Sequence, residues 1–231
     1  MERTINIVGQ VTEQLATNVI DQISELRQIT NEDLEKVISY NAKVKPDNYI
    51  APEPVIVNIS SPGGFVIYGN AIIDELRSLN VPIITRCLGM AASMGYLIYL
   101  SGDYRIMGDS ATLMYHGASN TLSGTLPNME ESLEFDKQLE ILGDKLVLKQ
   151  TKITQDKLDF YKERSKNWYM FKEEGLKNGS VTDDLSLEEV MDLAEDEWIK
   201  TYIKEMDNLI KSTKKNEESD ENKEEADKET K

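Results

Sequence analysis

The sequence predicts an α/β protein in which parallel strands alternate with helices, and three observations lead to this fold class. Short apolar runs typical of buried strands occur at residues 54–58 and 81–86. Segments with the apolar spacing of helices follow them at residues 65–79 and 92–100. Glycine and proline mark the first strand-to-helix turn. Alternation of this kind indicates right-handed crossovers and a parallel sheet.

The first part of the chain is expected to form a strand, a helix and a polar surface segment. Residues 4–9 alternate in polarity and end in glycine, as many strands do. Apolar residues at helical spacing follow over residues 15–26. Residues 30–33 have the composition of a cap for a short helix that ends at Ile38. We interpret the polar residues 30–51 as a surface insertion between a helix and a strand.

The second half of the chain is predicted to become mainly helical. Two short strands at residues 103–107 and 111–115 complete the expected sheet. Residues 129–151 form a helical pattern too long to bury its whole face on a small domain. We assign residues 1–210 to a single domain. Residues 211–231 are almost wholly charged and cannot bury enough apolar surface to order themselves, so a disordered tail is expected there.

Composition narrows the class of protein. The 231 residues suit one α/β domain with a full core. The net charge of −16 argues against nucleic acid or an anionic membrane as a partner. The single cysteine, Cys87, excludes an intramolecular disulfide and is compatible with a reducing cytosol. Because the chain also lacks an apolar membrane span and a signal-peptide pattern, we expect a cytoplasmic protein, and we predict no metal site and no cofactor.

Three short motifs point to nucleophilic chemistry. Ser93 stands among small residues in Gly-Met-Ala-Ala-Ser-Met-Gly, which suits a tight turn into a helix whose free N–H groups favour an oxyanion. His116, the one histidine of the chain, ends a short apolar run, a place where catalytic groups lie in α/β sheets. Residues 58–64, Asn-Ile-Ser-Ser-Pro-Gly-Gly, let backbone N–H groups turn toward a ligand. Taken alone, each motif also fits a structural role: a buried helix, a structural histidine and an ordinary turn.

Together and in this order, the motifs resemble the proteolytic subunit of the Clp protease, a serine peptidase of the crotonase-like superfamily. Gly64 precedes Ser93 by 29 residues (93 − 64), as in that family, and the resemblance covers residues 2–184. It implies repeated β-β-α or βαβ units, with residues 129–151 as a protruding handle helix that interdigitates with an opposite ring. It also implies homo-oligomeric heptameric rings stacked as a tetradecamer. An AAA+ unfoldase would deliver unfolded polypeptide substrates to it in an ATP-dependent manner.

The resemblance also assigns roles in catalysis and substrate binding. It makes Ser93 the nucleophile and His116 its base, and the amides of Gly64 and Met94 the donors that hold the oxyanion. In the family a glycine-rich strand after the histidine pairs with the substrate backbone, and residues 117–125 here are small and polar. A flexible loop is the alternative for that stretch. The residues expected to bind substrate are Gly117, Ser119, Ser123 and Gly124.

The third catalytic position departs from the family pattern. The family has an aspartate twelve residues before a glycine that corresponds to Gly179, and residue 167 (179 − 12) is Asn167 here. An asparagine carbonyl can accept a hydrogen bond from the imidazole Nδ1–H, as in papain-like proteases, but it lacks the full charge that stabilises imidazolium. Asp183 and Asp184 are lower-ranked alternatives because they fall where later residues of the motif belong.

Three functions stay open at this point. The leading hypothesis is a serine endopeptidase subunit of a Clp-like barrel, and the runner-up is a catalytically weak or inactive ring subunit that modulates a partner subunit. An acyl-CoA enzyme is a third, because the crotonase fold also uses backbone oxyanion donors, although the pair of Ser93 and His116 argues against it. In the family, a segment that lines the axial pore precedes the position of Glu2, so gating of the pore by that segment is not expected here. A phage-type or divergent paralogue is compatible with this departure from the family.

Overall fold

One mixed six-stranded sheet forms the centre of the computed structural model, which describes residues 3–229. The strand order is β1-β2-β3-β5-β6, and β4 also pairs with β3. All pairs are parallel except β5 with β6, which confirms the predicted α/β class. The strands are β1 (Thr4–Val8), β2 (Val55–Ser61), β3 (Ile83–Ala92), β4 (Tyr104–Met107), β5 (Thr112–Tyr115) and β6 (Trp168–Met170).

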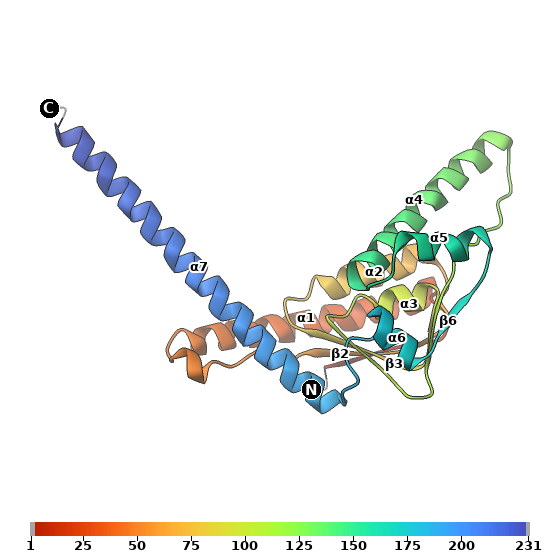
Figure 1. Cartoon of the computed structure of the whole chain (residues 1–231), viewed down its shortest axis with the longest axis horizontal. Helices are drawn as coiled ribbons and strands as arrows, with labels where there is room; N and C mark the ends of the chain where they lie inside the picture. The colour runs from red at the N-terminus through yellow and green to blue at the C-terminus, as the bar shows by residue number, and fades with distance from the viewer. Residues whose placement is uncertain (1–2, 230–231) are drawn as a thin grey trace.

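Seven α-helices and one 3-10 turn are assigned within residues 3–229, and two of the helices leave the body of the molecule. Figure 1 shows α4 and α7 projecting from the sheet-containing body in different directions. The elements are α1 (Glu13–Asn41), η1 (Pro46–Asn48), α2 (Val66–Arg77), α3 (Met94–Tyr99), α4 (Leu126–Gln150), α5 (Gln155–Glu163), α6 (Lys172–Asn178) and α7 (Leu187–Glu229). Within residues 3–229 we find no helix with both the length and the hydrophobicity that a membrane span requires.

The long strand β3 determines where the site lies. Its first half pairs with β4 and its second half, from Met90 to Ala92, pairs with β5. The strand β3 therefore extends past the residues that pair with β4, and its last residue, Ala92, pairs with Met114 of β5. The strand ends there, and α3 begins two residues later at Met94. The segment that bears the sequence-predicted nucleophile is thus placed next to the segment that bears the only histidine.

The sheet buries side chains on both of its faces. One face, with the helices α1, α2 and α3, forms the main core, in which alternate β2 residues such as Val57 and Ile59 are fully buried. Alternation of this kind is the expected signature of a strand with one face packed against helices. A smaller cluster joins Ile84 and Tyr104 to Val190 at the start of α7. Burial of these apolar side chains attaches the root of α7 to the sheet.

The helix α1 corrects one expectation from the sequence. Thr30 was expected to begin the cap of a separate short helix, but α1 continues without a break from Glu13 to Asn41. Thr30 is buried within α1, and its hydroxyl donates to the carbonyl of Arg27, a bond typical of a helix interior. Helical apolar spacing continues past Thr30 to the buried Val37, so packing outweighed the local cap signal. That residues 30–51 are an insertion stays a prediction.

The backbone of α7 is helical as far as Glu229. That residues 211–231 form a disordered tail stays a prediction. Lysine and glutamate are good helix formers, so a helical backbone there does not require a buried face. Residues 230–231 lie outside the described part of the chain.

Candidate active site

Ser93 occupies a strained turn between β3 and α3. Its φ of 52° and ψ of −122° lie in a region that side chains other than glycine rarely adopt. Its backbone N–H donates to the carbonyl of Met114 at 2.8 Å, which helps to hold this conformation. A serine on a strained strand-to-helix turn is the arrangement of a nucleophile elbow. Strain of this kind, about 1–3 kcal/mol, persists where the surroundings enforce it, and it concentrates at functional sites.

The neighbouring Gly63–Gly64 turn is held open by Val11. The Val11 N–H donates to the Gly63 carbonyl at 2.8 Å, and the Val11 carbonyl accepts from Phe65 at 2.9 Å. Gly64 has a φ of 151°, and a Cβ there would lie 2.3 Å from the Val11 carbonyl oxygen, so the turn requires glycine. The Gly64 N–H is left without an acceptor among the described residues. The same holds for the N–H of Met94, the first residue of α3.

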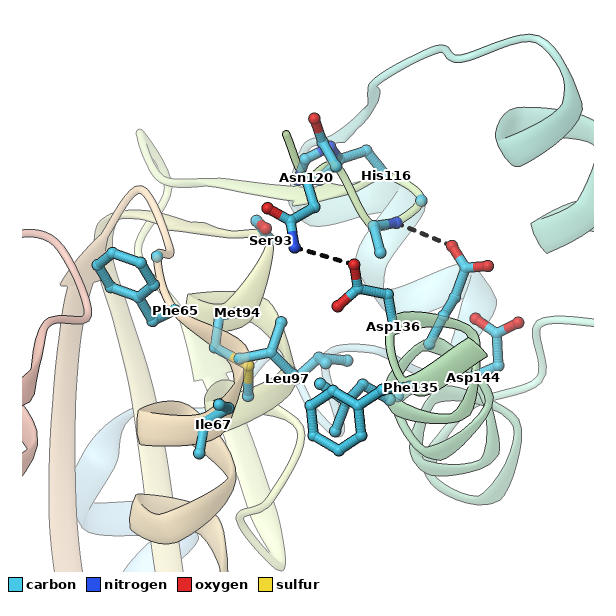
Figure 2. A pocket seen from close by; sticks show the side chains of 18 of the residues that line it. Phe65, Ile67, Ser93, Met94, Leu97, His116, Asn120, Phe135, Asp136 and Asp144 are labelled. Carbon is cyan, nitrogen blue, oxygen red and sulfur yellow. Dashed lines mark hydrogen bonds between the residues drawn. The ribbon is translucent and has the colours of Figure 1, made fainter. Parts of the chain in front are cut away.

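A cavity of about 920 Å³ opens in front of Ser93. Figure 2 shows its two halves: apolar side chains that include Ile67, Leu97 and Phe135 lie on one side, and His116 and Asp136 on the other. Six of the residues predicted from the sequence line this one cavity. They are Ser93, His116, Gly64, Met94, Gly117 and Ser119. Ser123, Gly124 and Asn167 do not line it.

The imidazole of His116 is partly buried at the end of β5. This desolvation lowers the pKa of His116 below its ordinary value of 6.5, because burial disfavours the charged ring. The ring is therefore mainly neutral at pH 7, which is the form that a general base needs. Within residues 3–229 we find no hydrogen bond between the imidazole and Ser93 or any other side chain. Unliganded sites often have longer distances between catalytic groups than liganded ones.

Asn167 directly precedes β6, the strand that pairs with β5. In the antiparallel ladder of β5 and β6, Met114 pairs with Tyr169 and Tyr115 with Trp168. The ladder ends at this last pair, so His116 and Asn167 each lie one residue beyond it. The Asn167 amide donates to the Tyr169 hydroxyl at 3.3 Å, and the structure does not show it bonded to the imidazole.

The two alternative acids lie elsewhere. Asp184 forms an ion pair with Lys172, which also pairs with Asp109 at 2.8 Å. Neither Asp183 nor Asp184 lines the cavity. Asn167, which lies one residue from the β5–β6 ladder as His116 does, remains the first candidate for the third group.

The stretch 117–125 forms no strand in this structure. Its small polar residues lack the alternating apolar pattern that would dock a strand on the sheet. Hydrogen bonds from the handle helix α4 hold it instead: Glu140 accepts from the Ala118 N–H at 2.8 Å, and Asp136 from the Asn120 amide at 2.9 Å. These acidic residues are not among those predicted from the sequence. Their four-residue spacing on one face of α4 was the available signal.

Residues 3–229 contain no group of three or more histidine, cysteine, aspartate or glutamate side chains placed to hold a metal ion. Cys87 is buried in β3, and burial raises the pKa of its thiol to about 12. A thiol with such a pKa stays protonated near neutral pH and is a poor nucleophile.

Comparisons with known proteins agree with this geometry. A family model described as Clp protease matches residues 47–184, which is more than half of the chain. A relative from Deinococcus radiodurans, described as "ATP-dependent Clp protease proteolytic subunit", is 32% identical over 138 residues. That match covers 58% of this chain and 66% of the relative, just under two thirds of its length. The residues that the family model matches include Ser93, His116 and the Gly63–Gly64 turn. The chain belongs to the Clp protease family.

Proposed function

We propose that the chain is a serine-type endopeptidase in which Ser93 attacks the carbonyl of a peptide bond. The observation that carries this proposal is the strained backbone of Ser93 at the mouth of a cavity that two unpaired amides also line. A hydroxyl on such a turn is exposed to substrate, and donors beside it can stabilise the charge that forms on attack. The mixed lining of the cavity accommodates an apolar side chain next to a polar peptide backbone.

In the proposed reaction, His116 moves one proton twice. It takes the proton of Ser93 as the Oγ–carbon bond forms, and the N–H groups of Gly64 and Met94 hold the resulting oxyanion. It then gives that proton to the leaving amine as the carbon–nitrogen bond breaks. Water, activated by the same imidazole, hydrolyses the acyl-enzyme and regenerates Ser93. Asn167 would accept from the imidazole Nδ1–H and so select its tautomer.

The wider setting is proposed from the family. The substrates would be unfolded polypeptides, with Gly117, Ser119, Ser123 and Gly124 beside the substrate backbone. The exposed apolar side chains of α4, among them Leu133 and Leu142, fit a contact between stacked rings of this chain. An AAA+ unfoldase in the cytoplasm would supply the substrates.

The test compares the purified full chain with Ser93→Ala, using a fluorophosphonate probe and a fluorogenic peptide. We expect labelling and hydrolysis by the wild type, and a loss of both in Ser93→Ala with the fold and assembly intact. Ser39→Ala, at an exposed position on α1 outside the cavity, serves as the matched control and should behave like the wild type. Undiminished turnover by Ser93→Ala would overturn the proposal.

A weak or inactive ring subunit is the second candidate, and the asparagine at position 167 favours it. Such a subunit would keep the fold and the assembly but leave Ser93 without an effective base. An intact oligomer that neither reacts with the probe nor hydrolyses peptide would support this role. A modulating subunit should also change the rate of peptide hydrolysis when it is mixed with a catalytically active subunit.

A further inference from the structure

Three carboxylates stand at four-residue intervals on α4: Asp136, Glu140 and Asp144. Residues four apart lie on the same face of a helix, so the three side chains form a row. Each of them accepts a hydrogen bond from the segment 115–120, which contains His116. We call these three residues the α4 carboxylate row.

The first of these bonds fixes the residue before His116. The Tyr115 hydroxyl donates to Asp144 at 2.8 Å, and Asp144 is buried and also forms an ion pair with Lys162 of α5. Burial, together with the neighbouring carboxylate, raises the pKa of Tyr115 well above its ordinary value. The hydroxyl thus stays protonated and remains a donor near neutral pH. The backbone of Tyr115 is held as well, because it pairs with Trp168 in the sheet.

The other two bonds fix the chain just after His116. The Ala118 N–H donates to Glu140, and the Asn120 side chain donates to Asp136, a bond drawn as a dashed line in Figure 2. Since residues 117–125 form no strand, sheet pairing does not hold this stretch in the structure. His116 therefore lies between Tyr115, anchored to the sheet and to Asp144, and Ala118, anchored to Glu140.

We propose that the α4 carboxylate row consists of positioning residues, which hold the imidazole of His116 toward Ser93 and keep the following segment in place for substrate. This inference rests on the proposed function, because it assigns a role to His116 in that reaction. A misplacement of about 1 Å can cost about a hundredfold in rate.

Glu140 offers the cleanest test, because a substitution there can either remove or keep the side-chain oxygen that accepts from the Ala118 N–H. Glu140→Ala removes the acceptor for the Ala118 N–H, whereas Glu140→Gln removes the charge but keeps an amide oxygen in its place. Glu134→Ala is the matched control, because Glu134 is exposed on α4 and its side chain accepts from Gln138 and pairs with Lys137, both on the same helix. We expect Glu140→Ala to lower kcat for peptide hydrolysis about tenfold or more, with KM changed less. Glu140→Gln should restore most of the loss.

A readout that needs no activity comes from the fact that His116 is the only histidine. In protein labelled with ¹³C at histidine Cε1, one imidazole signal reports this ring. At a pH where the ring is neutral, we expect the signal to shift or broaden in Glu140→Ala and to stay near the wild-type position in Glu140→Gln and Glu134→Ala. If the wild type proves to lack peptidase activity, the proposed function fails while this measurement still tests the row.

Three outcomes would overturn the inference. The first is a Glu140→Ala protein whose imidazole signal and kcat match those of Glu134→Ala. The second is Glu140→Gln behaving like Glu140→Ala, which would assign the effect to charge and not to the hydrogen bond. If Glu140→Ala fails to assemble, Asn120→Ala takes its place, because it removes the exposed hydrogen bond to Asp136. We expect this variant to perturb the imidazole signal more weakly. An unchanged imidazole signal in Asn120→Ala is the third outcome that would overturn the inference.

Discussion

At the scale of residues, the proposed reaction depends on His116 and Asn167. The ladder of β5 and β6 ends one residue short of each of them, and partial burial keeps the imidazole neutral at physiological pH. An amide at position 167 can select the tautomer of the ring, but it cannot balance the positive charge that the ring acquires when Ser93 reacts. The two predictions at this scale concern that charge.

Asn167→Asp is expected to raise peptide hydrolysis about tenfold, equivalent to about 1.4 kcal/mol of the barrier. A carboxylate facing His116 would stabilise the imidazolium formed during attack. In a trypsin-like enzyme the reverse change costs about 10⁴, and the gain here is smaller because the surroundings suit an amide. Rates at equal oligomer concentration, from roughly pH 6 to 9, provide the measurement. An equal or lower rate with the assembly intact would mean that Asn167 is not the partner of His116, and Asp183 and Asp184 would be tested next.

The pH dependence of hydrolysis should report the His116 pKa. Because desolvation lowers this pKa below 6.5, the ring is neutral and able to act as a base at pH 7 and above. Lowering the pH through the depressed pKa protonates the ring, so kcat/KM should fall with a midpoint below 6.5. Protonation also favours the unfolded chain, whose histidine has the higher pKa, so stability should decline over the same acidic range. A midpoint above 6.5 in kcat/KM would contradict the burial of the ring.

At the scale of elements, Arg105 of β4 joins segments that are far apart in the sequence. Its buried guanidinium donates to the backbone carbonyls of Gln150, Gly179 and Ser180 at 2.9–3.1 Å, and also to Gly102. Gln150 ends α4 and Gly179 follows α6, so one side chain satisfies the free carbonyls at the ends of two helices. This fixes the base of the handle helix to the sheet.

Arg105→Met is predicted to destabilise the protein by about 3–5 kcal/mol. The substitution keeps much of the buried volume but leaves several buried carbonyls unsatisfied, at about 1–3 kcal/mol for each group that water cannot reach. Chemical denaturation of the variant should give a correspondingly lower midpoint. Arg164→Met, an exposed arginine that donates to the carbonyl of Phe160, is the control and should change stability by less than about 0.5 kcal/mol. Equal effects of the two variants would refute the structural role of Arg105.

At the scale of the whole molecule, α4 and α7 carry surface that a single chain does not cover. In the first turns of α7, Val190 and Ala194 pack against the sheet. Farther along α7, Tyr202 makes an edge-to-face contact with Tyr49. Met206 and Leu209 beyond them are exposed. The contacts of α7 named here lie between Val190 and Tyr202, in its first half.

Deletion of residues 211–231 is expected to leave the thermal stability nearly unchanged. The segment is almost wholly charged and has too few apolar residues to dock on the domain, whether its backbone is helical or not. Calorimetry of the truncated and full chains at equal subunit concentration would test this. A drop of several degrees in Tm would show that the segment packs against the protein or against another subunit.

The sequence by itself determined the features that depend on short stretches of chain. Apolar runs, alternating residues and turn-forming glycines are local signals, so five of the six strands, the elbow at Ser93 and the Gly63–Gly64 turn could be predicted. The short strand β6 was not predicted, because its three residues form a strand only by pairing with β5. The roles of the site residues in catalysis remain predictions. Only the tertiary structure decided how Asp144, Glu140 and Arg105 are used, because each binds groups at least 22 residues away in the chain. The continuity of α1 through Thr30 was also settled by packing, since local propensity is worth less than burial of an apolar face.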